Sequence, residues 1–302
     1  MKPSRILLTA LIDYAGLFPP AKLAMVDAVK KYAAHRASDK AWMLGRFIVP
    51  VARLTEFESV AAEFLPHEGD DPWPMSALIG ENLDADIDRI FEFNQAHAED
   101  HAAGLAVVDA IELRADGPRS VDRAMGVIPE QLAPYFELPH DSDLRGLITS
   151  LAGTDARAKI RCGGVTVDAF PSPEHLAEFL TLCHAADVAF KATAGLHHPA
   201  RAEHALTYEP GAPRGVMHGF LNVFLAAAFV RRANMTRDDA ALMLREENAQ
   251  EFRFGDETVS WRQYSVTAAL LASVRESFAI GFGSCSFDEP IADLRSLALL
   301  PE

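Results

Sequence analysis

The sequence is poor in cysteine, in long apolar runs and in positive charge. Its 3 cysteines are too few and too far apart for a disulfide framework or a Cys-x-x-Cys zinc site, so reduced thiols and a cytoplasmic location are expected. No run approaches the roughly 20 apolar residues of a membrane helix. The apolar segment 6–12 ends at Asp13 without the small-residue cleavage site of a secretory signal, so no signal is expected.

Basic residues are scarce relative to acidic ones. The chain has 28 Lys and Arg against 43 Asp and Glu, a net charge of −15, and therefore lacks the basic face that nucleic acid or an anionic membrane would require. A small anionic substrate is compatible with this composition, because a few Lys and Arg can reverse the field inside one pocket. Whether the chain forms a homo-oligomer is left open by the sequence.

Short apolar segments alternate with longer segments of helical periodicity. Eight segments have the length and composition of buried strands: 6–12, 43–51, 75–80, 105–114, 135–138, 156–161, 188–194 and 278–282. Helices are predicted after the first six, at 23–36, 55–64, 84–97, 120–125, 143–152 and 173–186. Thr55 and Ser172 are expected to cap two of these helices, and Glu58 completes a capping box with Thr55.

Eight strand–helix alternations predict an α/β fold, a single (β/α)8 TIM barrel that occupies residues 1–302 as one domain. An extra insertion is expected between strands seven and eight. It comprises a loop over the barrel mouth at 201–214, helices at 220–232 and 237–248, a hairpin at 252–259 and a helix at 263–276. An open doubly wound sheet is the alternative, but residues 14–20 lack its glycine-rich fingerprint.

Charged residues interrupt the predicted strands near their carboxyl ends, where a barrel carries its active site. Strands have a period of two, so Lys159 and Arg161 share one face of the sixth strand, and Lys191 and Thr193 share one face of the seventh. Three further strands add charges in the same way: Glu112 and Arg114 on the fourth, Glu137 on the fifth and Asp13 on the first. Buried lysines are costly unless paired, so these charges predict a site, or alternatively an ion-pair network that only stabilises the barrel.

Glycines beside these strands favour ligand binding. Gly163 and Gly164 follow the sixth strand and let backbone amides approach a ligand closely. Gly283 and Ser284 follow the eighth, where they could present an amide and a hydroxyl to an anion or form only a tight turn.

Histidines gather after the seventh strand. His197, His198 and His218 are expected to contact substrate or to relay protons near neutral pH. The usual zinc-binding spacings are absent, so no metal site is assigned to them. Asp13 is expected to hold a lysine or accept a proton, or else to cap the turn that follows it.

The segment 158–198 resembles the class I aldolases of the deoxyribose-phosphate aldolase type. In that family a lysine on the sixth strand forms a Schiff base and a lysine on the seventh lowers its pKa, and the stretch from Phe190 to Leu196 is similar to the family's seventh strand. The likeness ends after Lys159, where an arginine and two glycines replace small hydroxyl residues. Glu112-Leu113-Arg114 is similar to the Glu-x-Arg strand of type I dehydroquinases. The whole chain resembles a group of uncharacterised bacterial barrel proteins that share its Lys-Ile-Arg and Lys-Ala-Thr-Ala-Gly-Leu-His-His-Pro stretches.

The leading hypothesis is a class I lyase that needs no cofactor and acts on a small carbonyl substrate carrying a carboxylate or phosphate. Lys159 or Lys191 would condense with the carbonyl, and the other lysine would lower its pKa. Glu112 or Glu137 would move protons, while Arg161 and Arg114 would hold the anionic group in a locally basic site.

Two alternatives are kept. One is a metal-dependent enolising isomerase or lyase, in which Glu81, Glu112 and Glu137 bind Mg²⁺ or Mn²⁺ and Lys159 is the base. The other is a barrel that binds a small anion without turnover, since fold alone does not choose among these activities.

Overall fold

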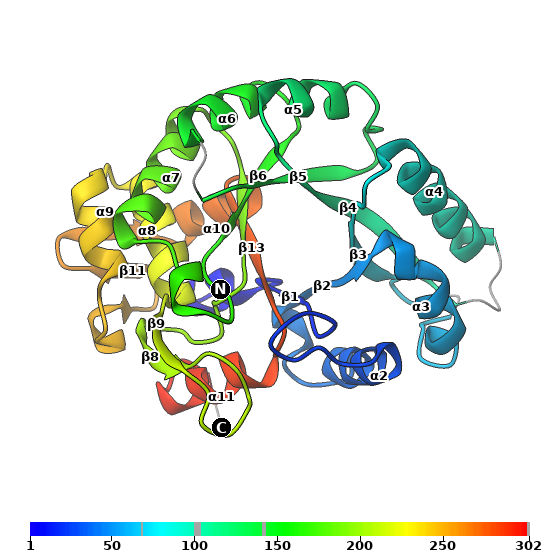
Figure 1. Cartoon of the computed structure of the whole chain (residues 1–302). Coiled ribbons are helices and arrows are strands. Elements are labelled where there is room, and N and C mark those ends of the chain that lie inside the picture. Colours follow the sequence, from blue (N-terminus) through cyan, green and yellow to red (C-terminus); the bar gives the residue numbers. More distant parts are fainter. Residues whose placement is uncertain (68, 100–103, 141–142, 301–302) are drawn as a thin grey trace.

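The computed structural model describes residues 1–67, 69–99, 104–140 and 143–300, and it contains a closed barrel of eight parallel strands (Figure 1). The strands follow one another around the barrel in the order β1-β13-β7-β6-β5-β4-β3-β2. They are β1 (Ile12–Tyr14), β2 (Leu44–Pro50), β3 (Trp73–Leu78), β4 (Ala106–Arg114), β5 (Ala133–Leu138), β6 (Arg157–Arg161), β7 (Phe190–Thr193) and β13 (Ala279–Ser284). The predicted TIM-barrel fold is confirmed.

Helices alternate with the strands and surround them (Figure 1). They are α2 (Met25–Arg36), α3 (Leu54–Ala61), α4 (Leu83–Glu99), α5 (Pro118–Met125), α6 (Leu144–Leu151), α7 (Pro173–Ala185), α8 (Phe220–Arg232), α9 (Arg237–Leu244), α10 (Ala268–Ser277) and α11 (Asp288–Ser296). The predicted cap of α7 is confirmed, because the Ser172 hydroxyl accepts a hydrogen bond from the His175 amide. Among the described residues, no helix is long and apolar enough to cross a membrane.

The amino-terminal prediction was wrong in part. Residues 6–12 were expected to form one strand, but α1 (Pro3–Leu8) precedes a strand that begins only at Ile12. Proline at the first helical position suits a helix start, and Leu7 and Leu8 bury their side chains as α1 packs against α10. A short apolar run fits a buried helix as well as a buried strand, so periodicity could not separate them.

The predicted capping box of α3 was also wrong. Thr55 lies inside the helix, which begins at Leu54 after a 3-10 turn (Val51–Arg53). Arg53 stands at the cap position, and its guanidinium pairs with Glu56 at 2.7 Å.

The insertion between β7 and β13 is more regular than expected. The predicted loop 201–214 includes β8 (Ala202–Ala205), which pairs with β9 (Arg214–Met217). The predicted hairpin is a three-stranded sheet of β10 (Arg253–Phe254), β11 (Thr258–Trp261) and β12 (Tyr264–Thr267), and α10 starts only at Ala268. Helix α8 packs against α7, α9 and β13 with every side chain from Phe220 to Val230 buried, as a helix apolar on all sides requires.

Candidate active site

Strand register places the charged residues of the barrel side by side. Lys159 on β6 is the register partner of Glu137 on β5 and of Lys191 on β7. Glu112 on β4 and Asp13 on β1 reach the same interior from the other strands. Lysines and carboxylates therefore meet inside the barrel, as the strand-end pattern predicted.

One carboxylate bridges the two lysines. Lys159 Nζ lies 2.6 Å from Glu112 Oε2, and Lys191 Nζ lies 2.6 Å from Glu112 Oε1. The outer sides of the lysines are also occupied, with Glu137 Oε2 2.7 Å from Lys159 Nζ and Asp13 Oδ2 2.6 Å from Lys191 Nζ. The result is an alternating row of charges from Asp13 through Lys191, Glu112 and Lys159 to Glu137.

The centre of this row is dry. The side chains of Glu112 and Lys191 are each 2% exposed. Burial alone would favour their neutral forms, but the ammonium groups of Lys159 and Lys191 hold the pKa of Glu112 well below its ordinary value. In the same way, Asp13 and Glu112 outweigh burial and raise the pKa of Lys191. Glu112 and Lys191 are consequently a carboxylate and an ammonium ion at neutral pH, and the Ser76 hydroxyl donates a 2.9 Å hydrogen bond to Glu112.

A cavity of about 340 Å³ opens above this row at the carboxyl ends of the strands. Glu112, Glu137, Lys159 and Arg161 form its charged wall, from β4, β5 and β6. The remaining wall is mostly small or apolar and consists of Ala15, Phe18, Pro19, Pro20, Ile48, Leu78, Gly164, Val165, Thr193, Ala194, Gly195, His197, Gly283 and Cys285. This volume is within the range that holds a small molecule.

The two lysines differ in access. Lys159 lines the mouth cavity, whereas Lys191 and Asp13 line a separate hollow of about 540 Å³ beneath it, together with Arg46. Asp13 also accepts a 2.8 Å hydrogen bond from the Arg46 amide, which fixes the carboxylate under Lys191. Only Lys159 of the pair therefore faces the volume in which a substrate would lie.

Several predicted binding residues line the cavity, and others do not. Arg161, Thr193, Gly164 and Gly283 line it, and the Arg161 guanidinium is 3.7 Å from Glu137. Arg114 was wrongly placed in the site, because β4 ends there and its side chain is 73% exposed and paired with Asp116.

Three other residues that were predicted to bind substrate instead contact other residues of the protein. Gly163 packs beneath the Phe170 ring, where a Cβ atom would be 2.3 Å from a ring carbon. Ser284 donates its hydroxyl to the Ser286 carbonyl, and His218 Nε2 contacts the Pro171 carbonyl at 2.7 Å.

The adjacent histidines are separated by their partners. His197 lines the cavity, and its Nδ1 is 3.1 Å from Glu289 Oε2 on α11. His198 Nδ1 is 2.6 Å from Asp293, one turn further along α11, and its ring stacks on His204 outside the cavity lining.

Glu289 and Tyr208 were missed by the sequence reasoning, and Cys285 had been considered only as a nucleophile without an assigned base. The Tyr208 hydroxyl donates to Glu289 at 2.9 Å and lies 3.6 Å from Cys285 Sγ. Burial raises the pKa of the Cys285 thiol, which makes it a poor nucleophile. The spacing of Glu289 and Asp293 predicts only that they share one face of a helix, and nothing in the sequence pairs that face with the histidines.

The charges of the site are balanced rather than basic. Three cations, Lys159, Lys191 and Arg161, face three carboxylates, Asp13, Glu112 and Glu137. The expectation of a locally basic site was therefore wrong, because Arg114 lies outside and every remaining cation has a carboxylate partner.

The carboxylate set expected for a metal is not assembled. Glu81 is exposed and does not line the cavity, while Glu112 is already held by both lysines. In the part of the chain that the structure describes, no three His, Cys, Asp or Glu side chains are grouped so that they could hold a metal ion.

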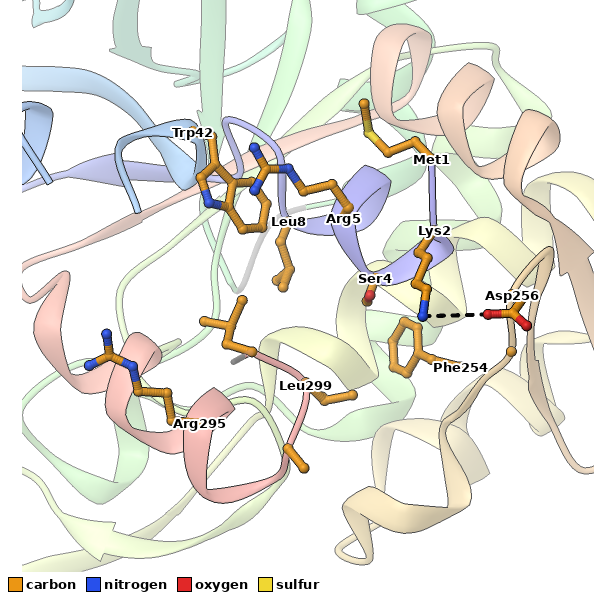
Figure 2. A pocket seen from close by; sticks show the side chains of 13 residues that line it. Met1, Lys2, Ser4, Arg5, Leu8, Trp42, Phe254, Asp256, Arg295 and Leu299 are labelled. Atoms are coloured by element: carbon orange, nitrogen blue, oxygen red, sulfur yellow. Dashed lines mark ion pairs between the residues drawn. The ribbon is translucent and has the colours of Figure 1, made fainter. Parts of the chain in front are cut away.

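Another hollow, of about 800 Å³, lies between α1, the turn joining β10 and β11, and the end of α11 (Figure 2). The Arg5 guanidinium stacks on the Trp42 ring at 3.4 Å, and Lys2 pairs with Asp256 at 3.5 Å. None of the residues predicted for the site lines this hollow.

The barrel mouth thus combines a lysine facing a small cavity with a carboxylate within proton-transfer distance and a second, fully buried ammonium. These groups suit condensation with a carbonyl compound. Comparison of the sequence with protein-family models and with curated proteins finds no match in either.

Proposed function

We propose that the protein is a class I lyase of the aldolase type that acts through a Schiff base on Lys159. The observation that carries this proposal is the pair of register partners on β6 and β7, of which Lys159 alone faces the mouth cavity. The resemblance of the segment 158–198 to Schiff-base aldolases supports the same choice, because it implies a nucleophilic lysine on the sixth strand.

Glu137 is placed to take the proton that Lys159 must lose before it can attack. Its Oε2 is 2.7 Å from Lys159 Nζ, and it lines the cavity. The neutral amine attacks the substrate carbonyl carbon, and Glu137 returns the proton to the carbinolamine oxygen, which leaves as water to give the iminium.

Lys191 and Glu112 are assigned an electrostatic role. The directions of their pKa shifts keep both charged, so neither exchanges protons at neutral pH. Their fixed charges lie below the nitrogen of Lys159 in a buried environment, where electrostatic interactions are strong.

Arg161 is the proposed contact for an anionic group of the substrate. Its side chain is 44% exposed at the cavity rim, and at 3.7 Å its contact with Glu137 is loose. A guanidinium in this position can bind a carboxylate or phosphate through two parallel hydrogen bonds. A small anionic carbonyl compound is therefore the proposed substrate class.

Borohydride trapping tests the proposal. Incubation with short keto acids and aldehydes, reduction and peptide mass spectrometry should locate the adduct on Lys159. Lys159→Met should abolish it, while Lys31→Met, a change at a half-exposed lysine on α2, should leave it unchanged. Absence of any adduct, or labelling spread equally over surface lysines, would overturn the proposal.

A further inference from the structure

Two histidine–carboxylate pairs stand next to each other at the barrel mouth. His197 pairs with Glu289 and His198 pairs with Asp293, and both carboxylates come from α11. Only His197 lines the mouth cavity that also contains Lys159. The two pairs have similar chemistry but different access to a substrate.

The His197 ring is held by a second layer of contacts. Glu289 Oε2 lies 3.1 Å from Nδ1 and accepts the Tyr208 hydroxyl at 2.9 Å, so one carboxylate oxygen joins the two side chains. Partial burial opposes the charge of Glu289, but its hydrogen bonds with His197 and Tyr208 and the electrostatic influence of nearby His198 lower its pKa, which keeps it a carboxylate. With Nδ1 occupied, Nε2 is the ring nitrogen left for proton exchange.

His197 and Glu137 belong to different walls of the cavity. Glu137 is on β5 and already contacts the Lys159 ammonium, whereas His197 follows β7 in the connection to α8. A proton acceptor on another wall suits a second position on the substrate, away from the carbon that joins Lys159.

Aldol cleavage acts on a β-hydroxycarbonyl compound, and we propose that His197, oriented by Glu289 and Tyr208, is the acid–base residue for this carbon–carbon cleavage. This inference rests on the proposed Schiff-base function. In the iminium, His197 Nε2 takes the proton of the β-hydroxyl as the bond between the α and β carbons breaks. The bonding pair enters the enamine on Lys159, and an aldehyde leaves.

The remaining steps restore both residues. The imidazolium returns its proton to the enamine carbon, which regenerates an iminium, and water hydrolyses this iminium to the free ketone and the Lys159 ammonium. No oxidant or reductant is needed. The negative charge of Glu289 stabilises the transient imidazolium, as a carboxylate does for a catalytic histidine.

The test uses 4-hydroxy-2-oxobutanoate, a β-hydroxyketone with a carboxylate, whose cleavage to pyruvate and formaldehyde can be followed with lactate dehydrogenase. His197→Asn should lower kcat by about 10²–10⁴-fold, the usual contribution of acid–base catalysis. The matched control His198→Asn should stay within about 3-fold of wild type, since acid–base catalysis is lost only at the residue that faces substrate. Circular dichroism and thermal unfolding establish that each variant is folded.

Two measurements distinguish a catalytic role of His197 from a purely structural role. His197→Asn should still give the borohydride adduct of pyruvate on Lys159, because imine formation does not use the β-hydroxyl. Glu289→Gln should lower kcat but leave the borohydride adduct of pyruvate on Lys159 unchanged, because the variant loses only the anion that orients His197 and stabilises its transient imidazolium.

Each of the other outcomes overturns one or both of the proposals. Equal loss in the His197 and His198 variants, or full kcat in His197→Asn, overturns the role of His197. A wild-type pyruvate adduct without cleavage of the hydroxyketone overturns the substrate class and leaves the Schiff-base function standing. Failure of the wild type to form any adduct overturns both.

Discussion

Replacing Glu112 with glutamine should strongly destabilise the barrel. The substitution keeps the shape of the side chain but removes the charge that lies between Lys159 and Lys191 at 2.6 Å from each. The new amide also has a donor where both oxygens of Glu112 now face ammonium groups. Removing one partner of a buried ion pair costs about 3–5 kcal/mol, and a folded domain has only about 5–15 kcal/mol in total.

The expected shift in melting temperature follows from chain length. An unfolding entropy of about 2.1 cal/mol/K per residue gives about 0.6 kcal/mol/K for this chain, so the substitution should lower Tm by about 5–8 °C. Differential scanning calorimetry or circular dichroism at neutral pH measures this shift directly.

A double substitution supplies the control. Glu112→Gln combined with Lys159→Met removes one charge of each sign and leaves two pairs, Lys191 with Asp13 and Arg161 with Glu137. It should recover most of the lost stability although it removes the proposed nucleophile. A Tm loss below about 2 °C in the single variant, or a double variant less stable than the single, would refute the reasoning.

Three further outcomes are expected. Gly195→Ala places a Cβ atom 2.7 Å from the Gly163 Cα at a φ of +69°, so it should cost more stability in urea unfolding than Gly153→Ala, where φ is +73° and the space is open; equal losses would contradict this. Because the pKa of Glu112 is lowered, its stabilisation is complete above about pH 4.3 and falls on acidification by about 1.4 kcal/mol per pH unit. The stability gap between wild type and Glu112→Gln should therefore narrow below that pH, and a constant gap argues against the bridge. Because the pKa of Lys191 is raised, its stabilisation is complete below about pH 10.4 and is lost above it. The gap between wild type and Lys191→Met should accordingly shrink in alkaline unfolding experiments, not widen.

The period of two along a strand correctly predicted the shared face of two side chains. It placed Lys159 and Arg161 on one face, and both line the mouth cavity. The same rule misplaced Arg114, although Glu112 two residues earlier is buried. The rule predicts which face of a strand a side chain lies on. It does not predict the residue at which the strand ends and becomes exposed, because that depends on the register with the neighbouring strands.

The histidines show a different limit of sequence reasoning. His197 and His198 are adjacent and chemically identical, and what separates them is contact with residues 92 and 95 positions away along the chain. Glu289 and Asp293 become partners of the histidines only when α11 packs beside the loop after β7. The amino-terminal error has a local cause instead, because a run of seven residues is too short to show its period.

The bridge formed by Glu112 has a consequence for how this barrel can change. A core of apolar side chains tolerates single replacements of similar volume, each at a modest cost. The middle of this barrel is different. Replacing any one of its charged residues with a neutral one leaves an unpaired charge in a buried environment; these residues are Asp13, Lys191, Glu112 and Lys159. Substitutions that arrive in oppositely charged pairs avoid that intermediate. New specificity should therefore be sought first at the rim, where Arg161 and Val165 meet solvent and can change one at a time.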